Sequence, residues 1–163
     1  MSMRSAASFR LFRCLLPVLT AATVPALEWA ELTGPWEVDL PATAALAPVN
    51  GTPPHLVEIW KQSAADHGGA LSLEFSADGV TPNVGPSRFN RLTHFASSSA
   101  TQASCQFKPG KAEVPTGPAL DVRFTLLASG QLEMQATESG FAFTLILART
   151  ATAAACATSA AKP

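Results

Sequence analysis

The amino-acid sequence predicts an all-β protein: an antiparallel up-and-down barrel of about eight strands, with one short helix between the first and second strands. Two observations lead to this prediction. Stretches in which apolar and polar residues alternate recur at intervals of roughly ten residues, and pairs such as Asp-Gly and Ser-Gly stand between them. Only residues 54–67 have apolar side chains at helical spacing.

Residues 1–26 resemble a secretory signal peptide, with a basic start, an apolar run at 14–24 and the small residue Ala26 at its exit. Pro17 interrupts the run, which is shorter than the roughly 20 residues of a membrane-spanning helix. We therefore expect cleavage after Ala26 and a periplasmic or secreted protein without a transmembrane anchor.

Removal of residues 1–26 takes three of the eleven basic residues and none of the twelve acidic ones, so eight oppose twelve and the formal charge becomes −4. No basic stripe remains to bind phosphates, so nucleic acid is not an expected partner. The remainder suits one barrel domain at 27–150, followed by a tail of low complexity at 151–163 that we expect to be disordered.

The first strand is expected at 32–40, where Trp36, Val38 and Leu40 alternate with polar residues. A Gly-Pro pair opens it, and proline is tolerated at the first position of a strand. Residues 41–54 are rich in Ala, Pro and Thr and contain an Asn-Gly pair, which predicts a loop with a turn.

The helix at 54–67 starts at a pair of prolines, carries Leu56, Ile59 and Trp60 at helical spacing, and stops at Gly68. A lone amphipathic helix normally docks on its own core, so Trp60 is expected to pack on the sheet. The alternative is that this face meets a partner.

Seven further strands are expected after the helix. Residues 71–84 predict a hairpin, with Pro82 either weakening its second arm or placing it at an edge. The next strands are expected at 88–95 and 102–108, and Ser-Gly turns then divide an antiparallel meander. The meander strands are expected at 120–126, 132–136 and 141–147. Because the last of these is apolar on both faces, the helix could cover its outer face.

An eight-stranded barrel is just wide enough to be filled by side chains or to hold one small ligand. A packed core and a cavity for a small apolar ligand therefore both stay open. The interior residues that would contact such a ligand are Phe75, Phe124, Met134 and Phe143.

Three motifs together resemble a known family: Gly34-Pro35-Trp36 opening the first strand, Leu73-Glu74-Phe75-Ser76-Ala77-Asp78-Gly79 in the middle, and Leu145-Ile146-Leu147-Ala148-Arg149 at the end. Over about residues 32–150 the chain resembles the lipocalin-like small exported bacterial proteins of the calycin type. The resemblance implies that the tryptophan of the first strand packs against an arginine of the last strand and closes one end of the barrel. Lipocalins proper carry a helix after the barrel, whereas here the expected helix lies between the first two strands.

On this chain the closure residues would be Gly34, Trp36 and Arg149. Arg149 has the same parity as Leu145 and Leu147, so its side chain is expected on the face that Trp36 also occupies. We expect the guanidinium to stack on the Trp36 ring within about 6 Å, an attraction of about 1 to 2 kcal/mol when partly desolvated.

Two cysteines follow the signal peptide, Cys105 and Cys156. Export allows a disulfide, which by closing about 50 residues would stabilise the fold by roughly 4 kcal/mol. The alternative is two free thiols, because Cys105 shares a face with Phe107 and Cys156 lies in the tail.

Catalysis has little support in the sequence. The histidines are His55, His67 and His94. His55 and Glu58 could share a helix face, but the spacing of zinc-binding motifs is absent. Since no nucleophile and base pattern occurs either, we expect no enzyme, no metal site and no cofactor.

Two functions remain as hypotheses. The first is a non-enzymatic binding protein that holds a small apolar ligand in the barrel. The alternative is an interaction or inhibitor-like module of the cell envelope with a fully packed barrel and no ligand.

Overall fold

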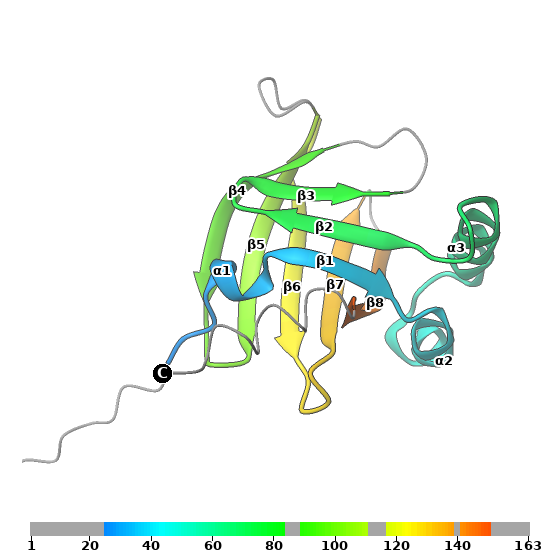
Figure 1. Cartoon of the computed structure of the whole chain (residues 1–163), viewed down its shortest axis with the longest axis horizontal. Helices are drawn as coiled ribbons and strands as arrows, with labels where there is room; N and C mark the ends of the chain where they lie inside the picture. The colour runs from blue at the N-terminus through cyan, green and yellow to red at the C-terminus, as the bar shows by residue number, and fades with distance from the viewer. Residues whose placement is uncertain (1–24, 84–88, 111–116, 139–140, 151–163) are drawn as a thin grey trace, which may run out of the picture.

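Eight antiparallel strands form a closed barrel in which each strand pairs with its neighbours in sequence and β8 pairs with β1 (Figure 1). The predicted fold class is confirmed, and the barrel is consistent with a lipocalin-like fold. The strands are β1 (Gly34–Val38), β2 (Ser72–Ser76), β3 (Gly79–Pro82), β4 (Asn90–Ser97), β5 (Gln102–Pro109), β6 (Leu120–Leu126), β7 (Leu132–Glu138) and β8 (Phe141–Arg149). The computed structural model describes residues 25–83, 89–110, 117–138 and 141–150.

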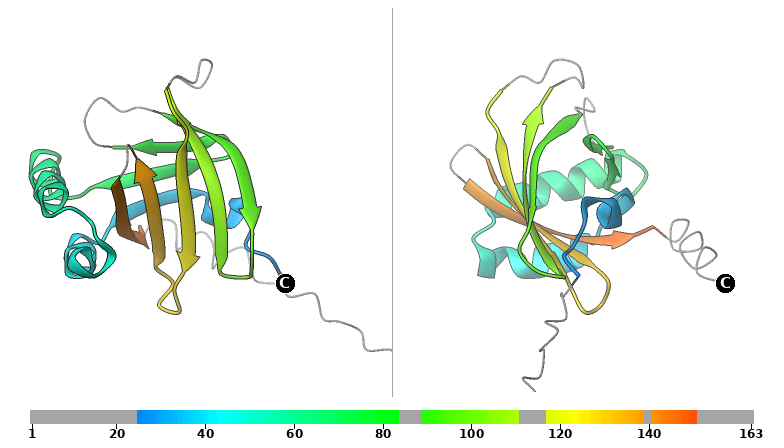
Figure 2. Two further views of the ribbon diagram at one scale, coloured as in Figure 1. Left: turned by 180° about the vertical axis from the view of Figure 1, so that it is seen from behind. Right: turned by 90° about the vertical axis from the view of Figure 1, so that its left-hand side faces the viewer.

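The strands form two layers that cross each other: β1 to β3 lie across β4 to β8 (Figures 1 and 2). The joins between the layers are short. Gly79 and Val80 of β3 pair with β4, while Trp36, Glu37 and Val38 of β1 pair with β8. Gly79 is required at its join, because a Cβ there would overlap the backbone carbonyl oxygen of Asn90.

Two helices, not one, lie between β1 and β2. Helix α3 (Pro54–Asp66) matches the expected helix, whereas the loop expected at 41–54 is wrong because α2 (Leu40–Asn50) forms there. The Asp39 side chain caps α2 by accepting a hydrogen bond from the Ala42 N–H at 3.0 Å, and Pro41 lies in the first turn, where proline is compatible with a helix.

Helix α2 and the turn after it provide hydrogen-bond acceptors for the unpaired edge of β8. Only the last three residues of β8 pair with β1. Along the rest of the strand, the N–H groups on the edge away from β7 need other hydrogen-bond partners. The Ile146 N–H donates to Thr43 Oγ1 at 3.0 Å, and the Thr144 N–H donates to Thr52 Oγ1 at 3.2 Å. The outer face of β8 is therefore covered as the sequence suggested, but by α2 and the turn after it.

Two element details differ from the sequence-based expectation. The first strand begins at Gly34, because Leu32 belongs to a short helix, α1 (Trp29–Leu32), that the sequence analysis did not predict. On α3 the buried residues are Val57 and Ala64, while Ile59, expected on the packed face, is 53% exposed.

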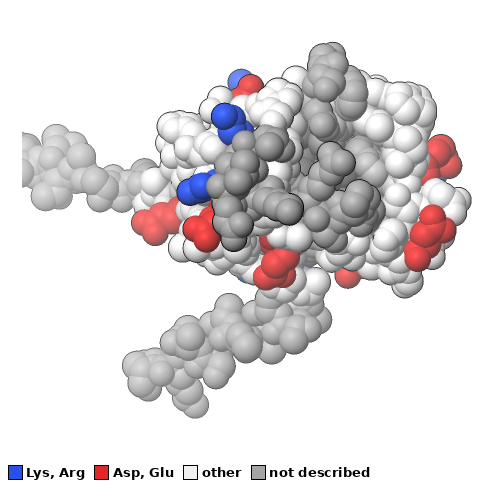
Figure 3. Space-filling view, turned by 90° about the horizontal axis from the view of Figure 1, so that it is seen from above, with Lys and Arg blue, Asp and Glu red and all other residues white. Residues whose placement is uncertain are grey.

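A single hydrophobic core fills the space between the two layers of strands. Its largest side chains with almost no solvent exposure are Trp36, Phe75, Phe107 and Phe124. Charged residues stay outside: in the view from above, the visible basic side chains lie on one side and acidic ones lie at several separate places (Figure 3). Within the described part of the chain, no helix is long and apolar enough to cross a membrane.

Candidate functional site

Trp29, which lies on α1 ahead of the first strand, is partly buried and packs against the hydrophobic core of the barrel. Its indole N–H donates to the backbone carbonyl of Ser76 at 2.9 Å, so the polar atom of the ring is satisfied. Four phenylalanine rings surround the indole with centroid distances of 5.6 to 6.3 Å, mostly in edge-to-face geometry. They are Phe75, Phe95, Phe107 and Phe124.

Each of the four residues expected to contact a barrel ligand belongs to the hydrophobic core or packs against it. The ring centroids of Phe75 and Phe124 lie 5.7 Å apart, and both rings contact Trp29. Met134 is buried, and Phe143 is partly buried with its ring 5.7 Å from that of Trp60 on α3. The structure thus brings Phe75 and Phe124 together and places Phe143 under a helix.

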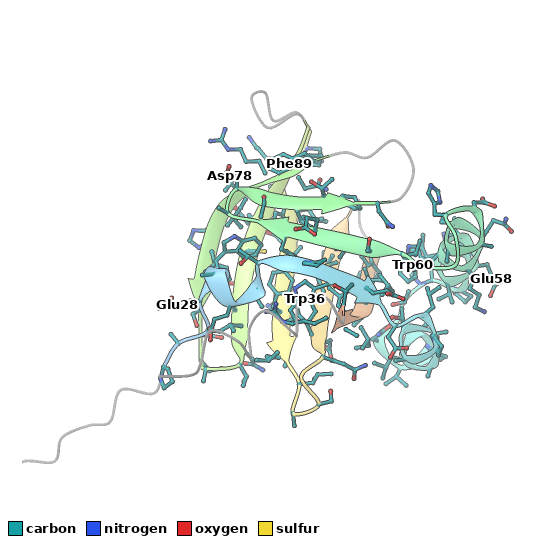
Figure 4. All side chains as sticks on the ribbon, viewed as in Figure 1. Glu28, Trp36, Glu58, Trp60, Asp78 and Phe89 are labelled. Atoms are coloured by element: carbon teal, nitrogen blue, oxygen red, sulfur yellow. The ribbon has the colours of Figure 1, made fainter. Side chains whose placement is uncertain are left out.

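Arg149 and Trp36 meet at the end of the barrel where α1 lies. The Arg149 Cζ atom is 4.5 Å from the centroid of the Trp36 ring, inside the range of about 6 Å for a cation–π contact. Arg149 also donates hydrogen bonds to the backbone carbonyls of Thr33 and Glu31, and the Trp36 indole N–H donates to the Leu32 carbonyl at 2.8 Å. Together these contacts fasten α1 over the end of the barrel, with Trp36 inside it (Figure 4).

Gly34 makes the bend between α1 and β1. Its φ of 110° lies in the region that side-chain-bearing residues rarely adopt. A Cβ at this position would also lie 3.8 Å from Nη1 of Arg149. The sequence analysis placed the Gly-Pro pair at the start of the first strand. In the structure, Gly34 of this pair turns the chain beneath Arg149.

Sequence reasoning missed Trp29, although a clue was present. Leu27 and Leu32, which flank it, are five residues apart and both almost fully buried, at 2% and 1% exposure. The Leu27 N–H donates to the Ser99 carbonyl at 2.9 Å, so the chain joins the core directly after the predicted cleavage site at Ala26. The apolar pattern of this short stretch could have been recognised as part of the domain.

The helices α2 and α3 carry the large apolar side chains that are exposed among the described residues: Leu46 at 37%, Val49 at 83% and Ile59 at 53%. Trp60 faces the barrel, whereas Glu58 points away from it (Figure 4). On the solvent side of α3, Glu58 forms a 2.8 Å ion pair with Lys61, an exposed contact that contributes little to stability. We refer to Leu46, Val49 and Ile59 as the helical apolar surface.

A polar groove of about 730 Å³ lies on the outer face of β4 to β8, beside the end of α2. Its exposed side chains alternate with core residues along the strands, which is why the floor is polar although the barrel is apolar inside. We call it the outer groove. The polar residues that line it are Asn50, His94, Ser104, Gln106, Asp121, Arg123, Gln135, Thr137 and Thr144.

Cys105 is buried on the inner face of β5, next in alternation to Phe107, and has no disulfide partner among the described residues. Burial, and to a lesser degree the charge of Asp121, raises the pKa of Cys105 to about 12. Its proposed disulfide partner, Cys156, lies outside the described residues, so the disulfide stays a prediction.

The raised pKa of the Cys105 thiol predicts how the stability of the fold depends on pH. The folded protein keeps Cys105 neutral up to about pH 12, whereas the thiol ionises near its ordinary pKa of 9.0 once the chain unfolds. The unfolded state is therefore favoured progressively as the pH rises from 9 towards 12. We expect Cys105→Ala to flatten this part of the stability profile in urea titrations. An unchanged slope would contradict the raised pKa.

The histidines do not assemble a reactive centre in the described structure. His55 and His94 are exposed, and His67 Nδ1 lies 2.7 Å from the Ser63 carbonyl oxygen at the end of α3. Within residues 25–83, 89–110, 117–138 and 141–150, no three His, Cys, Asp or Glu side chains are grouped so that they could hold a metal ion.

Comparison with known proteins adds no assignment. No protein-family model matches the chain, and no curated protein is similar to it in sequence.

Proposed function

We propose that this protein is a non-enzymatic interaction module, lipocalin-like in fold and exported to the cell envelope, whose barrel serves as a packed core. The observation that carries the proposal is the aromatic packing of the barrel: Phe75, Phe107 and Phe124 are almost fully buried inside it, and the partly buried Trp29 ring packs against them. A ligand in the barrel would have to displace this ring and leave the Ser76 carbonyl without its donor.

Binding then has to use the outside of the molecule. The helical apolar surface is the place where large apolar side chains of the described residues meet solvent. The two helices that carry them contact each other. In this proposal the three side chains form one patch, the kind of exposed apolar surface that marks interaction sites. A partner protein would bury Val49 and Ile59, the two most exposed of the three side chains.

Photo-crosslinking in the native host tests this function. A benzophenone amino acid at Ile59 or Val49 should capture a discrete partner, whereas the same group at Glu74, an exposed residue of β2, should not. Native mass spectrometry of the purified protein should show the bare mass of the chain that begins at Leu27. Equal capture from all three positions would contradict the proposal, and so would a stoichiometric small apolar adduct.

A further inference from the structure

The acidic and amide side chains near the outer groove already have partners. Asp121 Oδ1 accepts a hydrogen bond from Gln106 Nε2 at 2.8 Å, and Glu133, beside the groove, accepts one from Gln135 Nε2 at 2.7 Å. These contacts link neighbouring strands or positions on one strand, and they reduce the capacity of the carboxylates to bind anything else. The groove is therefore a poor site for a cation.

Arg123, by contrast, is unpaired among the described residues. It projects from β6 into the outer groove and is exposed, and among the described residues it has no hydrogen-bond or ion-pair partner. Ser104 lies directly beside it on β5 and Gln135 on β7, as the strand register requires. A planar guanidinium with five donors thus stands between two polar side chains, beside an acid that is already hydrogen-bonded.

We propose that the outer groove binds a carboxylate through Arg123. The guanidinium presents two parallel N–H groups that match the two oxygens of a carboxylate, and the Ser104 hydroxyl can donate a third hydrogen bond. The groove's volume of about 730 Å³ lies within the range of ligand sites, roughly 300 to 1,000 Å³.

The charge of the groove favours a ligand that places one singly charged negative group beside Arg123. Arg123 is the one permanent cation among its lining residues, and Asp121 is the one carboxylate. A phosphate with two charges would meet repulsion from Asp121 without a second fixed cation to offset it. A carboxylate matches the single guanidinium. It could belong to a free organic acid or to an acidic side chain of a bound protein.

The test is a titration of the ¹⁵N-labelled protein, followed by backbone amide chemical shifts, with glutarate and with its uncharged analogue glutaramide. We expect glutarate to cause saturable shifts at Arg123, Ser104 and Gln135, and glutaramide to cause none there. Arg123→Gln should weaken glutarate binding about tenfold, the loss expected when a bidentate charged contact is removed. Arg123→Lys keeps the charge but loses the fork, so it should show a smaller loss.

Lys108→Gln is the matched control, because Lys108 is an exposed basic residue of β5 that does not line the groove. It should leave glutarate binding unchanged. All three variants alter exposed side chains, and far-UV circular dichroism verifies that each has folded. Equal binding of glutaramide, retained affinity in Arg123→Gln, or the absence of saturable shifts would overturn the proposal.

A second arm separates the two sources of the carboxylate. The probe is the blocked peptide N-acetyl-Leu-Glu-Leu-amide, compared with its glutamine analogue. Binding of the acidic peptide about tenfold tighter than glutarate assigns the site to a protein partner, and equal affinities assign it to free acids. This titration involves neither α2 nor α3, so its failure is distinguishable from failure of the crosslinking through the helical apolar surface.

Discussion

Replacing Trp29 with alanine is expected to lower the free energy of unfolding by about 3 kcal/mol, near the lower end of the range for truncating a large aromatic side chain in a core. The loss combines the contacts with four phenylalanine rings and the hydrogen bond to the Ser76 carbonyl. Urea denaturation followed by far-UV circular dichroism measures it.

Two variants control for this result. Trp29→Phe keeps most of the ring but loses the N–H donor, so it should fall between the wild type and Trp29→Ala. Ile59→Ala removes an apolar side chain that is 53% exposed and should change stability by less than about 0.5 kcal/mol. If Trp29→Ala is no more destabilising than Ile59→Ala, the packing of the indole against the barrel core does not stabilise the fold.

Replacing Arg149 with methionine is expected to cost about 2 kcal/mol, because it removes the contact with the Trp36 ring and two hydrogen bonds from a charged donor. The carbonyls of Glu31 and Thr33 lose their donors, so α1 should open more often. Hydrogen exchange at the Leu27 amide, which donates to Ser99, should accelerate as α1 detaches.

Arg149→Lys separates charge from geometry. Lysine keeps the positive charge but cannot bond to both carbonyls while covering the indole, so it should recover less than half of the stability. Lys108→Met, which removes an exposed positive charge elsewhere on the sheet, should leave both stability and exchange near the wild-type values. Full recovery of stability by lysine would contradict the fastening role of the guanidinium.

The strands were predictable because one of their faces is buried and the other is wet. In β5, for example, the buried residues Ala103, Cys105 and Phe107 alternate with exposed ones, and this alternation is visible in the sequence. The position of Arg149 followed from the same parity. Local periodicity and turn residues thus determine most of the barrel.

Helix α2 was not predictable from periodicity, because its sequence of Ala, Pro and Thr has no apolar stripe. It forms because Asp39 caps its start, because Gly51 ends it with φ of 76°, and because Thr43 and Thr52 satisfy β8. The last reason depends on a strand about 100 residues away in sequence, as the separation of 103 between Thr43 and Ile146 illustrates. Such a contact leaves no local pattern.

The candidate sites were predictable only in part. The pairing of Trp36 with Arg149 was expected from the family resemblance together with strand parity, whereas the outer groove depends on five adjacent strands and the end of α2. Its key side chain, Arg123, looks in sequence like any polar residue on the wet face of a strand. Only the register identifies Ser104 and Gln135 as its neighbours.

The most direct test of the packed barrel is a nuclear Overhauser measurement on the purified protein in solution. The Trp29 indole protons should show contacts to the ring protons of Phe75, Phe95 and Phe107, whose centroids lie 5.6 to 5.9 Å from the indole. These contacts should be present without any added ligand. A Trp29 indole with no contacts to these rings, and with water-exposed chemical shifts, would contradict a barrel filled by its own chain.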